Sequence, residues 1–222
     1  MSSKGRLAIL GASGHGKVVA DIALQCGWRE IGFYDDAYPE RSSVALWPVI
    51  GSFQTLLGDL DRFEATVVAI GDNRTRDARL EALFRQGASL ATLVHPRAVV
   101  SPFARLSPGC VVVGGAVINA FATLARGCIV NTASTVDHDC RLANAVHVAP
   151  GGHLAGEVSV GAFSWLGVGA VVRQGLCLGE DVMVGAGAVV VSDVADGQTV
   201  VGVPARPLSR GRHDGSLTST PE

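Results

Sequence analysis

The sequence predicts two domains of different fold: a small parallel α/β sheet of Rossmann-like type, followed by a parallel β-helix of hexapeptide repeats. From Val100 to Val190, every sixth residue is aliphatic without exception. A second column, which runs from Ala104 to Ala188, is restricted mainly to small side chains. A period of six fits neither an α-helix nor a plain sheet and is the repeat of a parallel β-helix. Residues 1–94 lack this period and alternate short apolar runs with helical spacing.

The N-terminal domain, residues 1–94, is predicted from that alternation. Strands are expected over residues 6–10, 30–34, 66–70 and 89–94, and helices over residues 18–26 and 76–86. Strands that alternate with helices indicate a small parallel sheet. His95-Pro96 interrupts the pattern, because the residue before a proline is disfavoured in helical conformation, and it marks the expected domain boundary.

The second domain is expected over residues 97–207. Three hexads form one triangular coil, which gives about five coils stacked at the strand spacing of about 4.8 Å. The period is never interrupted, so no long loop should leave the coils. Residues 208–222 are polar and are expected to form a disordered tail.

Composition excludes several classes of function. The formal net charge is −2 and aromatic residues make up 5%, so the chain has neither the basic patch nor the stacking surface of a nucleic-acid-binding protein. No apolar run approaches the ~20 residues of a membrane span, and the first residues do not form a signal peptide. Five cysteines without C-x-x-C spacing indicate reduced thiols and a cytoplasmic location. Cys110, Cys128 and Cys140 fall in the small-residue column and are expected to be structural.

A glycine-rich loop follows the first predicted strand, and a helix follows the loop. Within this loop, GASGHG, the candidate ligand-binding residues are Gly11, Ser13, Gly14 and His15. Such a loop lets the backbone approach a phosphate, while the helix N-terminus supplies free N–H groups. Asp35 and Asp36 end the second strand, where an acidic side chain can bind a ribose or a base. A tight turn without a ligand is the alternative. About 94 residues suit a single nucleotide, with or without a sugar, better than a dinucleotide.

Three histidines lie close together in the hexad region. His138 is flanked by Asp137 and Asp139, and an adjacent carboxylate can orient an imidazole and raise its basicity, as a general base requires. His147 and His153 precede inward-facing column residues, so both should point outward. His138 and His147 are half a coil apart and sit on different sides of one prism. If both serve one site, that site must form between subunits, as in a trimer of prisms. A zinc site built from the three histidines is the minority alternative.

Taken together, GASGHGKVV, IGDN, INTASTVDHDC, AVHVAPGGHLAGEVSVG, WLGVGAVV, VGAGAVVVSDV and VVGVPAR resemble the bacterial acetyltransferases that act on nucleotide-linked amino sugars. The resemblance covers nearly all of residues 6–207. It implies a left-handed β-helix that forms a homotrimer, with acetyl-CoA as co-substrate in the groove between neighbouring prisms and no metal. The substrate implied is a UDP- or GDP-linked 4-amino-4,6-dideoxy sugar, acetylated on its 4-amino group for surface polysaccharide or glycan biosynthesis.

The resemblance also implies roles for single residues. His138 would be the general base, and Asp139 would support it in place of the more usual Glu. Four residues would bind acetyl-CoA: His147, Gly156, Ala186 and Arg206. The N–H of Gly156 would face the acetyl carbonyl and stabilise the oxyanion. The nucleotide sugar would be held by Gly11, Ser13, Gly14, His15, Asp35, Asp36, Gly71, Asn73 and Asn131.

Direct acyl transfer without a covalent enzyme intermediate is the expected mechanism. Three alternatives stay open from the sequence. The first is O-acetylation of a sugar of the sialic acid type. The second is a zinc-dependent enzyme resembling β-helix carbonic anhydrases, and the third is a nucleotide-sugar sensor without catalytic activity.

Overall fold

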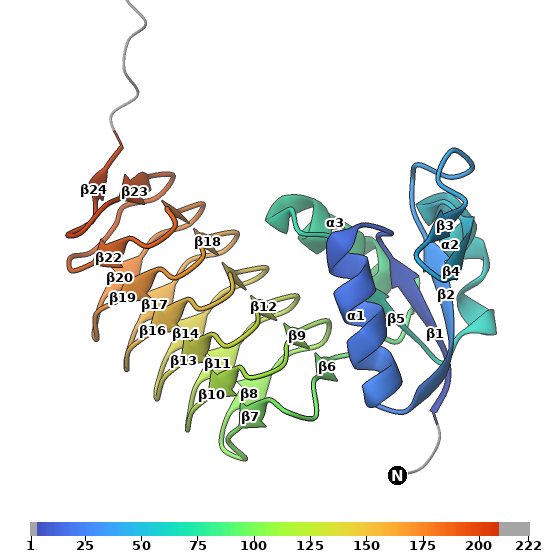
Figure 1. Cartoon of the computed structure of the whole chain (residues 1–222), viewed down its shortest axis with the longest axis horizontal. Helices are drawn as coiled ribbons and strands as arrows, with labels where there is room; N and C mark the ends of the chain where they lie inside the picture. Colours follow the sequence, from blue (N-terminus) through green and yellow to red (C-terminus); the bar gives the residue numbers. More distant parts are fainter. Residues whose placement is uncertain (1–3, 209–222) are drawn as a thin grey trace, which may run out of the picture.

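The computed structural model describes residues 4–208 and has two parts, an α/β sheet and a prism of stacked coils (Figure 1). The predicted tail lies outside the described residues from residue 209 on. No helix within residues 4–208 is long and apolar enough to cross a membrane.

The N-terminal part is a five-stranded sheet with the order β3-β4-β2-β1-β5. The strands are β1 (Lys4–Leu10), β2 (Trp28–Tyr34), β3 (Ser43–Val44), β4 (Trp47–Gly51) and β5 (Ala65–Val68). The helices are α1 (Gly14–Gln25), α2 (Phe53–Gly58), the short 3-10 turn η1 (Leu60–Arg62) and α3 (Asn73–Arg85). All pairings are parallel except that of β3 with β4.

Both faces of this sheet are covered, which explains why its strands read as apolar runs. Side chains of α1 pack with one face of the sheet in a cluster that includes Val19 and Ile22, while α2 and α3 contribute Leu56, Leu80 and Leu83 to the other. The predicted strands and helices that became β1, α1, β2, β5 and α3 are confirmed. The β3–β4 hairpin and α2 were not predicted, because residues 35–62 carry no clear periodicity.

The C-terminal part is a left-handed parallel β-helix whose coils form a triangular prism with three faces. The six-stranded face contains β7 (Val99–Val100), β10 (Val117–Ile118), β13 (Thr135–Val136), β16 (His153–Leu154), β19 (Val171–Val172) and β22 (Val189–Val190). The five-stranded face contains β8 (Arg105–Leu106), β11 (Thr123–Leu124), β14 (Arg141–Leu142), β17 (Ser159–Val160) and β20 (Cys177–Leu178). The eight-stranded face contains β6 (Leu93–Val94), β9 (Val111–Val112), β12 (Ile129–Val130), β15 (His147–Val148), β18 (Trp165–Leu166), β21 (Met183–Val184), β23 (Thr199–Val201) and β24 (Arg206–Pro207).

The predicted aliphatic column forms the interior of the prism. Its members from Val112 to Val190 are all buried, with exposed fractions no higher than 3%. The three cysteines of the small-residue column are buried as well, and the thiols of Cys110, Cys128 and Cys140 donate to backbone carbonyls. The hexad register therefore sets which side chains point inward along the whole prism.

The corners of the prism are also periodic. From Gly109 to Gly187, every sixth residue has a positive φ, and only some of these residues are glycines. One of the others is Asp139, at φ +58°. Asp tolerates the left-handed region better than most side chains. This backbone turn aims the side chains on either side of each corner.

The sequence prediction was wrong for the segment before the boundary. Residues 89–94 were expected as a strand of the first sheet, but β6 pairs with β9 of the prism instead. The first half of the segment does join the first sheet: around a bridge between Leu90 and Thr66 of β5, the N–H of Thr66 donates to the carbonyl of Ser89 at 2.8 Å and the N–H of Ala91 donates to the carbonyl of Thr66 at 2.9 Å. Val94 stands six residues before Val100, so it continues the hexad column. The prism therefore begins at Leu93, without a linker between the two parts.

The two parts share a packed boundary. Side chains of α1 and β1 lie in one apolar cluster with Val111, Val113 and Ile129 of the eight-stranded face. The α/β part therefore covers the N-terminal end of the eight-stranded face. Without it, these apolar side chains would be exposed to solvent.

Candidate functional site

The clearest catalytic geometry lies at His138, on the corner between the six-stranded and five-stranded faces. Nδ1 of His138 lies 2.9 Å from Oδ2 of Asp139. Asp137 accepts from the backbone N–H of His138 at 2.8 Å and from the side-chain amide of Asn119 at 2.7 Å. Since a carboxylate faces Nδ1, that nitrogen carries the proton in the neutral ring and Nε2 keeps its lone pair.

The electrostatics of this corner suit a proton acceptor. The hydrogen bond to Asp139 raises the pKa of His138 above its ordinary value, and the charges of Asp137, Asp139 and Glu157 act in the same direction. The side chain is 53% exposed, so a substrate can reach it. The amide of Asn119 and the backbone N–H of His138 hold the pKa of Asp137 below its usual range, so this neighbour stays ionised.

Gly156 lies one coil above His138 on the same corner. The backbone N–H of Glu157 donates to the carbonyl of His138 at 2.9 Å, which joins the two coils. A Cβ added to Gly156 would stand 2.4 Å from Nε2 of His138. Any larger residue at position 156 would therefore displace the imidazole of His138 from the position in which it lies here.

Some glycines in and near the glycine loop are required by close contacts within the protein, and others are not. Gly11 has φ +112°, and a Cβ there would lie 2.7 Å from the carbonyl oxygen of Ala69. A Cβ on Gly16 would lie 2.3 Å from the carbonyl oxygen of Gly11. Around Gly14 and Gly71, by contrast, there is open space. These two glycines follow β1 and β5, which are neighbours in the sheet, so they mark one open edge.

Asp35 and Asp36 are engaged within the protein. Asp35 accepts from the backbone N–H of Ala12 at 2.7 Å and that of Ala37 at 3.0 Å. Burial alone would raise the pKa of Asp35, but these bonds and Arg41 lower it overall. Asp36 accepts from the N–H of Phe53, and from Arg79 at 2.7 Å. The first carboxylate thus fixes the glycine loop, and the second ties α2 to α3.

His15 and His147 meet where the glycine loop covers the eight-stranded face. Their ring centroids are 6.4 Å apart, and the ring of His147 lies 4.1 Å from that of Trp165. Burial lowers the pKa of His147 to about 3 and that of His15 to about 4, and the charge of Arg76 adds to both shifts. His147 points out of the prism as predicted, but it is only 4% exposed because the N-terminal part covers it.

Asn131 fixes the form of this imidazole. Its Oδ1 accepts from the N–H of Thr132 at 2.8 Å, so its Nδ2 donates to Nε2 of His147 at 3.1 Å. Nε2 must then be the unprotonated nitrogen. The structure therefore brings Asn131 and His147 together at the eight-stranded face. His138 lies apart from them, on the corner between the other two faces.

The side chain of Asn73, which was predicted to contact the nucleotide, makes hydrogen bonds within the protein, and its role as a ligand stays a prediction. Its Nδ2 donates to the carbonyls of Phe163 at 2.7 Å and Ser164 at 3.2 Å, and its Oδ1 accepts from Arg76. Both N–H donors of this buried side chain are therefore engaged at the boundary between the two parts. Arg76, which is fully buried beside it, was missed, because a lone arginine in a helical pattern reads as a solvated residue.

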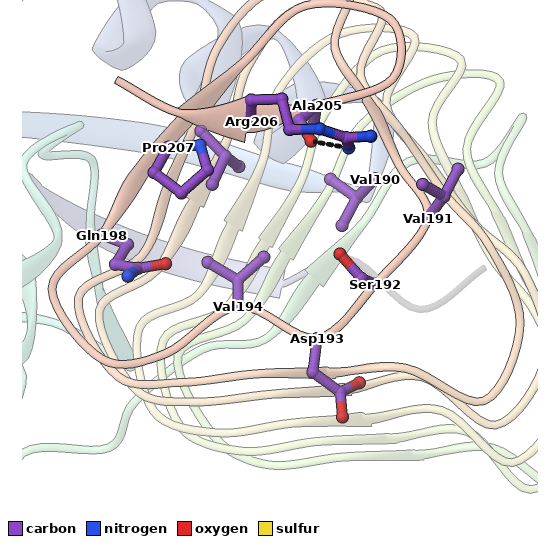
Figure 2. A pocket seen from close by; sticks show the side chains of 10 residues that line it. Val190, Val191, Ser192, Asp193, Val194, Gln198, Ala205, Arg206 and Pro207 are labelled. Carbon is purple, nitrogen blue, oxygen red and sulfur yellow. Dashed lines mark hydrogen bonds between the residues drawn. The ribbon is translucent and has the colours of Figure 1, made fainter. Parts of the chain in front are cut away.

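Ala186 and Arg206 lie toward the C-terminal end of the prism. Ala186 is exposed on the corner between the eight-stranded and six-stranded faces, which also carries Asn131. Arg206 borders a hollow of about 320 Å³ that is also lined by Val190, Asp193 and Gln198 (Figure 2). Its guanidinium donates to the carbonyl of Ala205 and keeps further donors for an anion.

The three histidines considered for zinc do not converge. His138 lies on a corner, and His147 and His153 lie on two different faces. Among residues 4–208, no three side chains of the metal-binding types come together.

Comparisons with known proteins agree with this arrangement. Residues 6–83 match the profile of the PglD N-terminal domain family. The chain is 32% identical to GDP-perosamine N-acetyltransferase of Escherichia coli O157:H7 over 149 residues, which are 64% of this chain and 67% of that protein.

Two solved structures are similar over almost the whole chain. The acetyltransferase domain of PglB from Neisseria gonorrhoeae FA1090, in complex with acetyl coenzyme A, is 45% identical with a TM-score of 0.88, covering 93% of this chain and 100% of that one. PerB from Caulobacter crescentus, in complex with CoA and GDP-perosamine, is 41% identical with a TM-score of 0.87, covering 92% and 97%.

Replacing Asp139 by Asn should lower the pKa of His138, because the hydrogen bond to a carboxylate is the largest cause of its rise. Glu157→Gln should lower this pKa less, since Glu157 acts only through its charge. NMR titration of the His138 ring proton in each variant measures both effects. An Asp139→Asn variant whose His138 titrates at the wild-type pH would contradict the assigned geometry.

Proposed function

The chain belongs to the family of bacterial nucleotide-sugar N-acetyltransferases, and from this premise we propose how its residues carry out the reaction. It is an acetyl-CoA-dependent enzyme that acetylates a nucleotide-linked amino sugar. The amine is that of a UDP- or GDP-linked 4-amino-4,6-dideoxy sugar in this proposal. The observation that carries it is the pairing of His138 with Asp139 in a half-exposed side chain whose Nε2 lies close to Gly156.

In the proposed mechanism, the amine nitrogen attacks the thioester carbonyl carbon of acetyl-CoA. As the C–N bond forms, Nε2 of His138 takes a proton from the nitrogen, and the resulting imidazolium is stabilised by Asp139. The C–S bond then breaks, and the CoA thiolate leaves and is protonated. The N–H of Gly156 would stabilise the negative charge that develops on the carbonyl oxygen. Because the pKa of His138 is raised, the base is lost to protonation at a higher pH than for an ordinary histidine.

The active site in this proposal is shared between subunits of a homotrimer. His138 lies on a corner away from the eight-stranded face, against which the glycine loop packs. The outward residues of the six-stranded face are mainly β-branched and apolar, and Val99 and Val171 among them are exposed. The five-stranded face is polar, with Arg105 and Arg141. An exposed apolar face is expected to be covered by another copy, and closed symmetry is the usual form.

The nucleotide is placed at the edge formed by Gly14 and Gly71. Neither glycine is required by contacts within the chain, so the close approach of a ligand explains them best. The exposed Ser13 precedes α1 and leaves its hydroxyl available, because it makes no capping hydrogen bond in the described structure. Ala186 and Arg206 would contact CoA on the prism, Arg206 through a phosphate. A cytoplasmic location is part of the same proposal.

O-acetylation remains the second candidate reaction within the same site. A hydroxyl group needs stronger base assistance than a neutral amine, and the raised pKa of His138 favours such assistance. The similar protein of Escherichia coli O157:H7 is a GDP-perosamine N-acetyltransferase, which favours N-acetylation. A thiol-release assay with UDP-, GDP- and dTDP-linked 4-amino sugars and with sialic acid separates the two.

His138→Ala should lower kcat by about 10²–10⁴-fold, the usual contribution of a general base, while both substrates still bind. CoA thiol release measures kcat, and calorimetry with each substrate measures binding. His95→Asn serves as the control, because His95 only accepts a local hydrogen bond from the N–H of Arg97 and should leave kcat unchanged. Turnover of His138→Ala near the wild-type rate would contradict the assignment of His138 as the general base.

Gly14→Ala should raise KM for the nucleotide sugar about tenfold, the equivalent of ~1.4 kcal/mol, because the methyl group enters the space left for the ligand. The fold should not suffer, since alanine favours a helix over glycine by about 1 kcal/mol. Gly16→Ala is the matched control: its Cβ collides with the Gly11 carbonyl, so its Tm should fall. An unchanged KM in Gly14→Ala would remove the nucleotide from this edge.

A further inference from the structure

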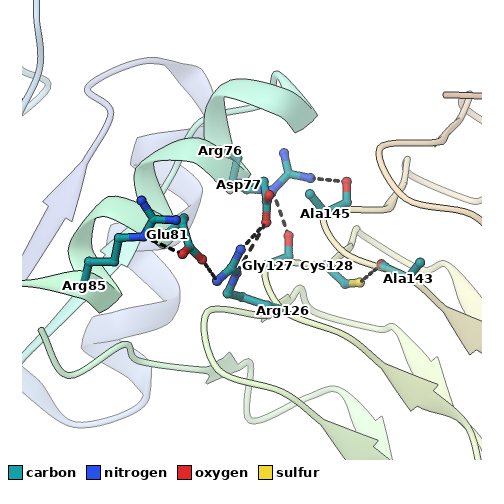
Figure 3. A network of polar contacts seen from close by, with 9 residues as sticks. All are labelled: Arg76, Asp77, Glu81, Arg85, Arg126, Gly127, Cys128, Ala143 and Ala145. Carbon is teal, nitrogen blue, oxygen red and sulfur yellow. Dashed lines mark hydrogen bonds and ion pairs between the residues drawn. The ribbon is translucent and has the colours of Figure 1, made fainter. Parts of the chain in front are cut away.

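Arg76 of α3 is a fully buried cation at the centre of the boundary between the two parts. It is 0% exposed, and its guanidinium makes five hydrogen bonds. Nε donates to the carbonyl of Gly127 at 2.8 Å, and Nη2 to that of Ala145 at 2.7 Å (Figure 3). Nη1 donates to the carbonyls of Ile70 and Gly71, both at 2.9 Å. Nη2 also donates to Oδ1 of Asn73 at 2.7 Å.

These five acceptors are all neutral. A buried charge without a bonded carboxylate is costly, so a residue with this environment needs a compensating role. Burial lowers the pKa of Arg76 to about 10, well above neutrality, so the charge persists. Unlike an apolar side chain, this guanidinium donates hydrogen bonds to both parts at once.

The acceptors connect two structures that must be held at a fixed spacing. Ile70 and Gly71 belong to the loop between β5 and α3, at the open edge where we place the nucleotide. Gly127 and Ala145 are corner residues of two successive coils, and Ala145 lies two residues before His147. A single planar guanidinium thus spans from the nucleotide loop to the coil that carries His147.

We propose that Arg76 is a positioning residue for acetyl transfer: its fork of donors locks the Ile70–Gly71 carbonyls of the nucleotide loop to the prism and so sets the distance between the two bound substrates. This inference rests on the proposed function, which places the nucleotide at the loop after β5 and acetyl-CoA on the prism. Arg76 touches neither substrate and acts through the backbone that it holds.

A second consequence is electrostatic. The charge of Arg76 opposes protonation of both His15 and His147, in addition to the effect of burial. Neutral His147 accepts the hydrogen bond from Asn131, whereas an imidazolium would lose it. The other charged or titratable groups that face Arg76 are Asp72 and Asp77 of α3 and the buried thiols of Cys110 and Cys128. Nothing bonded to Arg76 neutralises its charge.

Other contacts across the same boundary provide a matched control. Arg126 of the prism forms ion pairs with Asp77 at 2.9 Å and with Glu81 of α3, as Figure 3 shows. Its guanidinium bonds to neither the nucleotide loop nor His147 in the described contacts. Arg126→Gln therefore weakens the docking of α3 without releasing the loop.

The experiment compares Arg76→Lys, Arg76→Gln and Arg126→Gln in the full-length protein. Lysine keeps the charge but cannot reproduce the planar fork, so Arg76→Lys should lower kcat about 10²-fold, the effect of a displacement near 1 Å between reacting groups. KM for acetyl-CoA should change less than kcat, because Arg76 makes no described contact with Ala186 or Arg206, which the proposal assigns to CoA. Arg126→Gln should lower Tm but keep kcat per folded molecule. If Arg76→Lys also keeps kcat, or if both variants lose kcat equally, Arg76 has only a structural role and the proposal is overturned.

A readout without catalysis separates this inference from the proposed function. Nitrogen-15 NMR of the imidazoles should show wild-type His147 neutral at pH 5, with its proton on Nδ1. In Arg76→Gln, the pKa of His147 should rise, because an opposing charge is gone, although burial keeps it below 6.5. If Arg76→Gln unfolds, the same measurement on Arg76→Lys should show a displaced Asn131–His147 bond without a change of charge. A His147 signal identical to the wild type in the folded variants would contradict the inference, whatever the enzyme acetylates.

Discussion

The strict six-residue register of the prism is the constraint on which the rest of this structure depends. Each hexad contributes one buried aliphatic residue, one outward side chain and one corner residue with positive φ, so an insertion anywhere would move every later side chain. The register places His138 on one corner and His147 on the opposite face. Because backbone hydrogen bonds join every coil to the next, neither side chain can move toward the other.

The N-terminal part adds what the prism lacks, which is an open edge of glycines and free helical N–H groups. Its attachment is unusually polar for a boundary within one chain. Beside the apolar cluster under α1, the first turns of α3 bond to four successive corner residues: Arg76 to Gly127 and Ala145, Asn73 to Phe163, and Arg74 to Asp181. Hydrogen bonds at fixed corner positions specify one docking position, whereas apolar packing alone would tolerate sliding.

The fold could be predicted from this one sequence because the six-residue period and the strand and helix patterns are both visible without an alignment. The hexad column, the glycine loop and the main strands and helices all follow from local patterns, and the corner position of His138 follows from counting along the column. The beginning of the prism at Leu93 was not predicted, because one hexad beside His95-Pro96 also reads as an ordinary strand. The contacts of Asn73 across the boundary were not predicted for a different reason, since its partners, Phe163 and Ser164, are about ninety residues away.

The contacts of the site could be predicted where they join neighbours in the sequence. They could not be predicted where they depend on how distant segments pack together. An aspartate next to a histidine is visible in the sequence, whereas the burial of His147 under the α/β part is not. The close approach between Gly156 and the imidazole of His138 joins residues one coil apart, so the register could have revealed it. No local pattern could have identified Arg76, because its acceptors come from the loop after β5 and from two coils of the prism.

The central claim, that His138 of one chain acts on a sugar held by the glycine loop of another, can be tested by mixing two inactive variants. Chains carrying His138→Ala and chains carrying Gly14→Phe would be co-expressed with different tags, and mixed oligomers purified and assayed for CoA thiol release. Our account predicts activity in the purified mixed trimers of about one third of the wild-type rate, because one of the three interfaces in every mixed trimer pairs two intact halves. Mixed oligomers as inactive as either parent would show that each chain completes its own site and would contradict the account.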